Sequence, residues 1–262
     1  MNVQPLFNYP GSKLRHAKHL SSLVPDSFDN YIEPFAGGAA MFFALAPKRA
    51  LLNDLFAPLI LAYEVARTID VDEFVSAVEA VVVLTQDECT TRVFRKLPTT
   101  PLEFLTLAYC VYNLGTPAIW DTNKGAGYMP STMRHRPTKT EGVTKVGRRA
   151  PGALGALREC DLTLTVGDFN EAVDMAKPND FVFLDPPYFG NHKLPYQFGA
   201  TQSSVFEALN RLDDVGAKFI LTVGGLDLPN LPWRIEVLPH IRAHAATHKK
   251  PRLMTEYAIM NY

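Results

Sequence analysis

Phe181-Val182-Phe183-Leu184-Asp185-Pro186-Pro187-Tyr188 is the most informative stretch of this chain, because an apolar run ends abruptly in an acid, two prolines and an aromatic residue. Four consecutive hydrophobic residues are typical of a strand that is covered on both faces of its sheet. Prolines fix φ and cannot continue the ladder of hydrogen bonds. The stretch therefore predicts a buried strand that ends at Asp185, and ligands of open α/β sheets bind at this carboxyl end.

Other short apolar runs share this pattern. They are residues 31–35, 50–52, 162–166, 218–223, 234–238 and 256–260. Helical spacing lies between several of them, as in Ser204 to Leu212, where Val205, Leu209 and Leu212 share one face and Gly216 follows as a stop signal. Strands that alternate with helices predict a doubly wound, Rossmann-like α/β sheet.

The middle of the chain has a different pattern. After Asp70, a plausible helix cap, apolar residues recur at helical spacing from Val71 to Val82, and a second apolar helix is predicted over 101–111. A loop rich in Gly, Pro and Asn follows over 113–136. We therefore expect a mostly helical insertion between the second and third core strands.

Composition limits the class of protein. The chain has 262 residues, 47% of them hydrophobic, which suits one large domain or a core with an insertion. We expect no signal peptide and no membrane span, since no apolar run approaches bilayer length. The three cysteines form no CxxC pair, so a reducing cytosolic setting is expected. We also expect no metal, although His240, His244 and His248 recur at helical spacing.

Charge is unevenly distributed although the net charge is only −1. Basic residues gather between Arg134 and Arg149, where Glu141 is the acid, and again between His240 and Arg252, where no acid occurs. Each run on its own is typical of a solvated loop. Two such runs in a nearly neutral chain also fit a localised surface that faces an anion such as nucleic acid.

A glycine-rich turn, Glu33-Pro34-Phe35-Ala36-Gly37-Gly38-Ala39, follows the first predicted strand. Glycines allow the backbone to approach a ligand closely. The spacing lacks the third glycine of a dinucleotide-binding turn, and Glu33 suits the ammonium and sulfonium of S-adenosylmethionine better than a pyrophosphate. Asp54 ends the second strand, where an acid binds ribose hydroxyls or caps a helix.

The residue types after the central strand suit methylation of an aryl amine. Such an amine is a poor nucleophile because its lone pair is delocalised into the ring. Asp185 and a carbonyl of the Pro-Pro segment can accept its hydrogens and stabilise the charge that develops on nitrogen. Tyr188 offers a flat face on which a base can stack, and a base in a duplex must be flipped out to reach it.

In this order, the motifs resemble the alpha group of the DNA adenine (N6) methyltransferases, the Dam-like D12 class. Asn8-Tyr9-Pro10-Gly11-Ser12-Lys13 comes first, then the glycine turn, Asp54, the insertion and Asp185-Pro186-Pro187-Tyr188. Val166-Gly167-Asp168-Phe169, Tyr196-Gln197-Phe198 and the final run from Arg252 to Tyr257 look like further motifs of the family.

The resemblance implies an S-adenosylmethionine-dependent core over 1–68 and 156–262, and a target-recognition domain over 69–155. It implies a catalytic set of Asp185, Pro186, Pro187 and Tyr188. The implied cofactor contacts are Tyr9, Lys13, Glu33, Phe35, Gly37, Asp54, Asp168, Phe169 and Asp185. Candidate DNA contacts are Asn8, Trp120, Asn123, Lys124, Arg134 and Arg136. Double-stranded DNA is the expected partner, with a restriction endonuclease as a possible second one, in a bacterial or phage-infected cytoplasm.

Some residues depart from the family pattern and leave alternatives open. Leu221-Thr222-Val223 replaces the common Leu-Ser-Asn, so a catalytically silent DNA-binding relative is one alternative. Asn8 stands where members that methylate GATC carry a lysine, so that target is not assumed. Methylation of cytosine, RNA or a protein amide is a further alternative. An NAD-dependent oxidoreductase is disfavoured by the glycine spacing.

Overall fold

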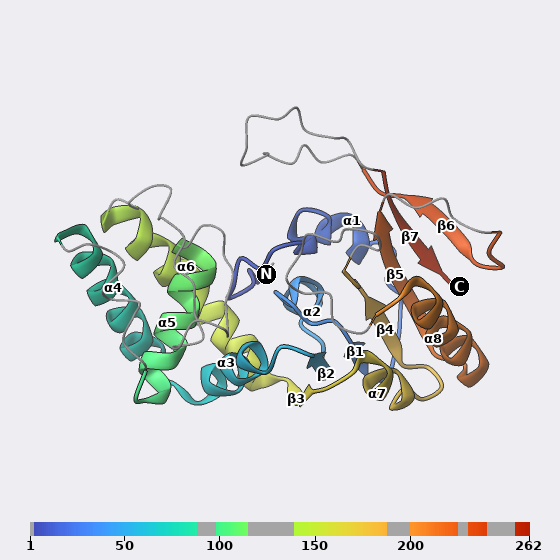
Figure 1. Ribbon diagram of the computed structural model, residues 1–262, viewed down its shortest axis with the longest axis horizontal. Helices are drawn as coiled ribbons and strands as arrows, with labels where there is room; N and C mark the ends of the chain where they lie inside the picture. The colour runs from blue at the N-terminus through green and yellow to red at the C-terminus, as the bar shows by residue number, and fades with distance from the viewer. Residues whose placement is uncertain (1–2, 88–97, 115–138, 188–199, 225–229, 240–254) are drawn as a thin grey trace. The chain divides into compact units, whose positions relative to one another are not determined.

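The computed structural model describes residues 3–87, 98–114, 139–187, 200–224, 230–239 and 255–262 (Figure 1). Several predictions fall outside these ranges. They concern Tyr188, Trp120, Asn123, Lys124, Arg134, Arg136, residues 196–198, the three histidines of 240–248 and residues 252–254.

The described residues contain one seven-stranded sheet with the order β3-β2-β1-β4-β5-β7-β6. Its strands are β1 (Tyr31–Glu33), β2 (Arg49–Asp54), β3 (Asp161–Val166), β4 (Phe181–Leu184), β5 (Lys218–Gly224), β6 (Arg234–Val237) and β7 (Glu256–Met260). Strand β1 is parallel to β2 and β4, β4 is parallel to β5, and β7 is antiparallel to β5 and β6. Every apolar run predicted as a strand is a strand. The fold is therefore α/β and Rossmann-like, and the strand order reverses between β1 and β4, where such sheets bind ligands.

One face of the sheet is covered by two helices, α7 (Phe169–Asp174) and α8 (Gln202–Val215) (Figure 1). Alternate strand residues on this face form a buried core with them, including Ile32, Val182 and Leu221. Helix α8 begins with a capping box between Thr201 and Ser204 and ends at Gly216, whose φ of 78° is accessible to glycine at little cost.

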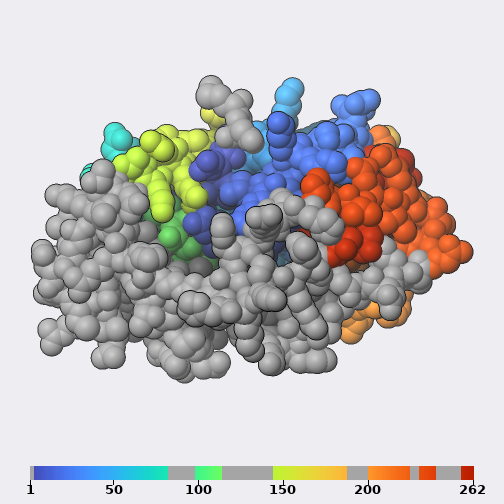
Figure 2. Space-filling model, turned by 90° about the horizontal axis from the view of Figure 1, so that it is seen from above, coloured from blue at the N-terminus to red at the C-terminus, as the bar shows by residue number. Residues whose placement is uncertain are grey.

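The opposite face of the sheet is covered by the segment that contains η1 (Lys13–Arg15) and α1 (Ala17–Ser21). Phe28, which follows these helices, packs against Phe181 with ring centroids 5.5 Å apart. The Tyr262 hydroxyl donates to the Leu23 carbonyl oxygen. In Figure 2 the blue surface of this segment adjoins the orange and red surface of the C-terminal strands. Strand β4 is thus buried on both faces, as its sequence predicted.

The insertion between β2 and β3 is helical in its described parts. It contains α3 (Ala57–Thr68), α4 (Val71–Asp87), α5 (Pro101–Leu114) and α6 (Lys139–Glu159), while the short α2 (Ala40–Leu45) follows the glycine turn. The Asp70 carboxylate accepts hydrogen bonds from the Asp72 and Glu73 amides, which confirms it as a cap. Helix α6 was not predicted, because Gly147, Pro151 and other helix breakers lie within it.

The chain divides into two compact units. One comprises residues 1–12, 37–46 and 57–161, and the other comprises 13–36, 47–56 and 162–262. The second unit contains the sheet. Residues 1–12, 37–46 and α3 belong to the helical unit, whereas the sequence assigned them to the core. The division into compact units does not show which segment recognises DNA, so the predicted target-recognition domain of 69–155 remains a prediction.

Among the described helices, none is both long and apolar enough to cross a membrane.

Candidate active site

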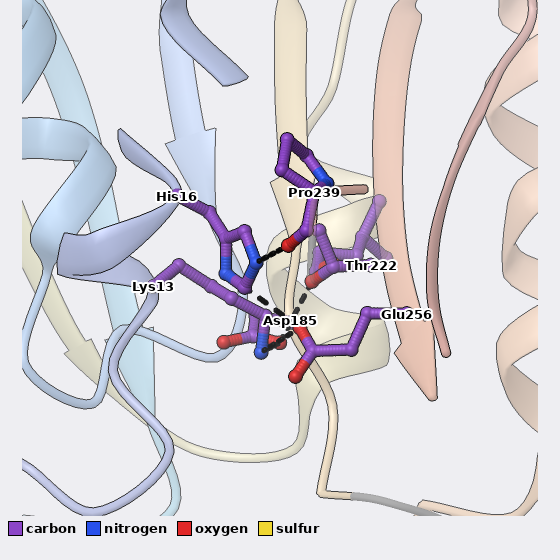
Figure 3. Close-up of polar contacts among 7 residues, drawn as sticks. Lys13, His16, Asp185, Thr222, Pro239 and Glu256 are labelled. Carbon is purple, nitrogen blue, oxygen red and sulfur yellow. Dashed lines mark hydrogen bonds and ion pairs between the residues drawn. The ribbon is translucent and has the colours of Figure 1, made fainter. Parts of the chain in front are cut away.

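Asp185 lies at the carboxyl end of β4, on the sheet face that the N-terminal segment covers. Leu184 pairs with Leu221 of β5, so Asp185 and Thr222 are the next residues in register. The Thr222 hydroxyl donates to Asp185 Oδ1 over 2.7 Å and lies 3.3 Å from the Leu184 carbonyl oxygen. Lys13 Nζ is 2.8 Å from the same Oδ1 (Figure 3). One oxygen of the carboxylate therefore receives two donors from different elements.

Glu256, the first residue of β7, extends this charge cluster. Its Oε2 is 3.8 Å from Lys13 Nζ and 3.7 Å from His16 Nδ1. His16 Nε2 is 3.1 Å from the Pro239 carbonyl oxygen, and because a carbonyl only accepts, Nε2 must carry the proton and donate. Within the described residues, the buried Glu256 Oε2 accepts no hydrogen bond (Figure 3).

Glu33 places a third carboxylate at this edge of the sheet. It is 2% exposed, and its Oε2 accepts a hydrogen bond of 2.8 Å from the Tyr31 hydroxyl. The pKa of Tyr31 lies well above its ordinary value because the hydroxyl is buried, and the charges of Glu33 and Asp185 raise it further. Among the described residues, three carboxylates and one lysine lie at this edge of the sheet, so their charges favour a cation.

Two aromatic rings lie at the ends of neighbouring elements on the other face. Phe35 follows β1 and Phe169 begins α7, and their rings stack with centroids 4.9 Å apart and planes 24° apart. Phe169 is buried, whereas Phe35 remains partly exposed. Asp168 caps α7 by accepting the Asn170 amide, so the carboxylate has a structural role. The exposed part of Phe35 leaves a flat apolar surface beside this acid.

The side chain of Asn53 joins the loops that follow three strands. Its Nδ2 donates to the carbonyl oxygens of Pro34 and Gly167, and its Oδ1 accepts the Thr165 hydroxyl. The side chain is buried at 1% exposure, and these bonds satisfy its amide. Asn53 therefore fixes the turns on either side of the neighbouring Asp54.

Asp54 is partly exposed after β2, and its Oδ1 accepts the Phe56 amide over 2.9 Å. Such a hydrogen bond fits the helix-capping alternative that its position in the sequence left open. An aspartate carboxylate has two oxygens, so this bond is compatible with a ribose contact as well.

In the helical unit, Tyr9 packs against the glycine turn. A Cβ on Gly37 would lie 3.1 Å from Tyr9 Cδ1, and one on Gly38 would lie 3.0 Å from Tyr9 Cβ. Gly37 also has a φ of 45°, and its carbonyl oxygen accepts the Tyr63 hydroxyl. The close packing and the positive φ explain why both positions are glycine.

Asn8 is exposed and is held by Arg149 of α6. Arg149 Nη1 donates to Asn8 Oδ1 over 2.9 Å and to Asn113 Oδ1 over 2.7 Å. Because a guanidinium has only donors, the Asn8 carbonyl oxygen must point toward it. The Asn8 amide NH₂ is thereby oriented away from Arg149.

Most of the predicted site residues are described, and two of their pairs are in direct contact in the sheet unit. Lys13 contacts Asp185, and Phe35 contacts Phe169. After Asp185, Pro186 is buried and Pro187 is exposed. Among the described residues, no group of three or more His, Cys, Asp or Glu side chains could hold a metal.

Sequence reasoning missed four residues that shape this region: His16, Asn53, Thr222 and Glu256. Each is a polar side chain that is buried or partly buried next to a motif described in the sequence. A polar residue within an apolar strand, such as Thr222 or Asn53, is the signal that could have found two of them.

A doubly wound sheet with an acidic cluster at its topological switch point is the arrangement of a Rossmann-like enzyme. Comparison with known proteins makes this more specific. Residues 9–99 match the family model of the D12 class N6 adenine-specific DNA methyltransferases. The Type II methyltransferase M1.LlaDCHI of Lactococcus lactis subsp. cremoris is 25% identical over 201 residues, which cover 72% of this chain and 66% of that protein. The chain is therefore similar to the D12 class methyltransferases over residues 9–99 and to a Type II methyltransferase over a longer stretch.

The match with the Lactococcus protein spans just under two thirds of that protein's length. Solved structures with overall similarity include a conserved hypothetical protein of Streptococcus pyogenes, with a TM-score of 0.37, 10% identity and coverage of 94% of this chain and 95% of that one. Another is yhhF of Escherichia coli, named as a candidate methyltransferase, with a TM-score of 0.37, 12% identity and coverage of 99% and 90%. These scores are too low to support a conclusion.

Proposed function

We propose that this chain transfers a methyl group from S-adenosylmethionine to the exocyclic N6 amine of adenine in DNA, after the base is flipped out of the duplex. The observation that carries the proposal is the Asp185 carboxylate, held by Lys13 and Thr222 at the end of the central strand. The match of residues 9–99 to the family model of the D12 class N6 adenine-specific DNA methyltransferases supports it. The family implies the methyl donor, and the site supplies an acid at the required position.

The cofactor suits the residues present. When bound, S-adenosylmethionine supplies a methyl group on a positively charged sulfur and also carries an ammonium group. Among the residues that the structure describes, the carboxylates of Glu33, Asp185 and Glu256 outnumber Lys13 at this edge of the sheet, so their charges favour a cation there. We assign Asp54 to the ribose, and Asp168 with the Phe35–Phe169 pair to the adenine moiety. Tyr9, Lys13 and Gly37 complete the proposed set.

In the proposed mechanism, Asp185 and a carbonyl oxygen of Pro186 or Pro187 accept the hydrogens of the adenine amine. The nitrogen lone pair is thereby directed toward the methyl carbon. Bound S-adenosylmethionine would supply the methyl group to this nitrogen, with the electron pair of the broken carbon–sulfur bond left on its sulfur. The positive charge on nitrogen is stabilised by the Asp185 carboxylate, which then accepts the proton that nitrogen loses. Tyr188 is assigned to stacking on the base.

DNA contact is assigned to Asn8 and, beyond the described residues, to Trp120, Asn123, Lys124, Arg134 and Arg136. The insertion 69–155 would read the target sequence. A cognate restriction endonuclease is proposed as a second partner, since the relative from Lactococcus is named a Type II methyltransferase. A cytoplasmic location would follow from this partnership.

The function can be tested with purified chain, tritium-methyl S-adenosylmethionine and duplex DNA of mixed sequence. We expect labelled DNA that yields N6-methyladenine on digestion to nucleosides and mass spectrometry. Labelled N4-methylcytosine, or label in RNA or protein but not DNA, would identify a different amine as substrate. DNA binding without any label, equal in the wild type and the Asp185→Ala variant, would instead support a silent DNA-binding protein.

A further inference from the structure

Two donors converge on one oxygen of the Asp185 carboxylate. The Thr222 hydroxyl reaches Oδ1 over 2.7 Å, a distance typical of a hydroxyl bound to an ionised carboxylate, and Lys13 Nζ reaches the same atom over 2.8 Å. In the described residues, Oδ2 accepts no hydrogen bond from any other group. The carboxylate is therefore fixed in rotation, with two donors on Oδ1, and within the described part of the chain Oδ2 is left to accept another hydrogen bond.

We propose that Thr222 is a positioning residue that holds Asp185 so that Oδ2 faces the amine of the target base. This inference rests on the proposed function and deepens it. A lysine alone cannot fix the plane of a carboxylate, because its ammonium is a compact charge on a flexible stem. Thr222 can, because its β-branched side chain has few rotamers within a strand and its hydroxyl is fully buried.

The register of the sheet supports this role. Thr222 follows Leu221 on β5 as Asp185 follows Leu184 on β4, so the two side chains project from adjacent strands onto the same face. Val223 lies on the opposite face, in the core with α7 and α8. Of the two residues that depart from the family's Leu-Ser-Asn, only Thr222 therefore contacts the carboxylate, and it retains the hydroxyl of serine.

The assignment also explains why a threonine tolerates complete burial here. Thr222 is 0% exposed in a strand of apolar neighbours, where a hydroxyl without a partner would be costly. Its bond to Asp185 satisfies that hydroxyl. A valine would fill the same space without the hydroxyl, so packing alone does not require threonine at this position.

The test compares the full chain with Thr222→Val, which keeps the shape, and Thr222→Ser, which keeps the hydroxyl. Under single-turnover conditions we expect Thr222→Val to lower the methyl-transfer rate about 10- to 100-fold, with S-adenosylmethionine affinity unchanged within about twofold. Thr222→Ser should restore the rate to within about threefold of the wild type. Thr163→Val, at an exposed position of β3, is the control and should leave the rate unchanged.

A wild-type rate in Thr222→Val would overturn the inference. Equal losses in Thr222→Val and Thr222→Ser would also overturn it, because the hydroxyl that serine keeps would then give no advantage. Crystal structures of the two variants provide a readout without activity: the Asp185 carboxylate should rotate in Thr222→Val and stay in place in Thr222→Ser. An unrotated carboxylate in Thr222→Val would refute the positioning role. If the wild-type chain methylates no DNA, the proposed function fails, and the crystal structures still decide whether Thr222 orients Asp185.

Discussion

Lys13 Nζ lies 2.8 Å from Asp185 Oδ1, and both side chains are largely buried, with 5% and 16% exposure. This contact joins the first motif of the sequence to the last strongly diagnostic one across 172 positions, the difference between 185 and 13. The ammonium gives the carboxylate a close charged donor, which helps to hold in place the acid assigned to the hydrogens of the target amine.

Loss of the Lys13 charge should weaken both stability and catalysis. Lys13→Met leaves Asp185 with the Thr222 hydroxyl alone, so we expect the free energy of unfolding to fall by about 2 kcal/mol. Urea unfolding measures this change. The control is Arg67→Met, which breaks an exposed pair with Glu64 and should cost less than about 0.5 kcal/mol. If Lys13→Met and Arg67→Met lower the free energy of unfolding equally, burial does not strengthen the Lys13–Asp185 ion pair.

The Phe35–Phe169 stack should matter for cofactor binding. Phe35→Ala removes a partly exposed ring, and we expect the dissociation constant of S-adenosylhomocysteine, measured by calorimetry, to rise about tenfold. Phe28→Ala is matched, since it removes a ring that packs on Phe181 at the amino end of β4. That control should lower stability and leave the dissociation constant unchanged. Unaltered binding in Phe35→Ala would remove these rings from the proposed cofactor site.

Asn53 should link stability to cofactor affinity. Asn53→Leu leaves the Thr165 hydroxyl and two carbonyl groups without their partner, so we expect a loss of about 2 kcal/mol and weaker binding of S-adenosylhomocysteine. Asn261→Leu is the comparison, because Asn261 also joins separate elements, through Phe219, Asp213 and Ala217. Asn261→Leu should lower the free energy of unfolding by a similar amount without changing the affinity for S-adenosylhomocysteine. A loss of affinity in Asn261→Leu alone would contradict the account.

Cys110 should make stability sensitive to alkali. Burial raises the pKa of its thiol from 9.0 to about 12, so the folded chain keeps the proton at a pH where the unfolded chain loses it. The resulting stabilisation is complete below pH 9 and declines between pH 9 and 12. Cys110→Ala should therefore show a flatter fall in stability over this range than the wild type, by urea unfolding. If the free energy of unfolding falls equally with pH in the wild type and in Cys110→Ala, burial does not keep the Cys110 thiol protonated.

The centre of the sheet could be predicted from sequence because β1, β4 and β5 are buried on both faces and appear in the sequence as runs of apolar residues. The helix α6 could not, since Gly147 and Pro151 within it carry the signals of a loop, and tertiary packing against α4 overrides them. The predicted acid Asp185 was recognisable from its motif. Its hydrogen-bond partner Thr222 was not, because Thr222 is adjacent to it only through the register of β4 and β5.

The same limit applies to orientation. Sequence identified Asn8 as a candidate DNA contact, but only the bond from Arg149, 141 positions away, determines that its NH₂ group points away from Arg149. Contacts of this kind depend on how distant elements pack, and a single sequence carries no local pattern that predicts them.

The most direct test of the central claim is the single-turnover rate of Asp185→Asn on duplex DNA, read out as N6-methyladenine. An amide at this position can still accept the Lys13 and Thr222 donors through its oxygen, so it places an NH₂ donor where Oδ2 was. We predict a loss of about 100- to 1,000-fold with S-adenosylhomocysteine binding retained. Methylation at the wild-type rate would contradict the account, because Asp185 would then not accept the hydrogens of the target amine.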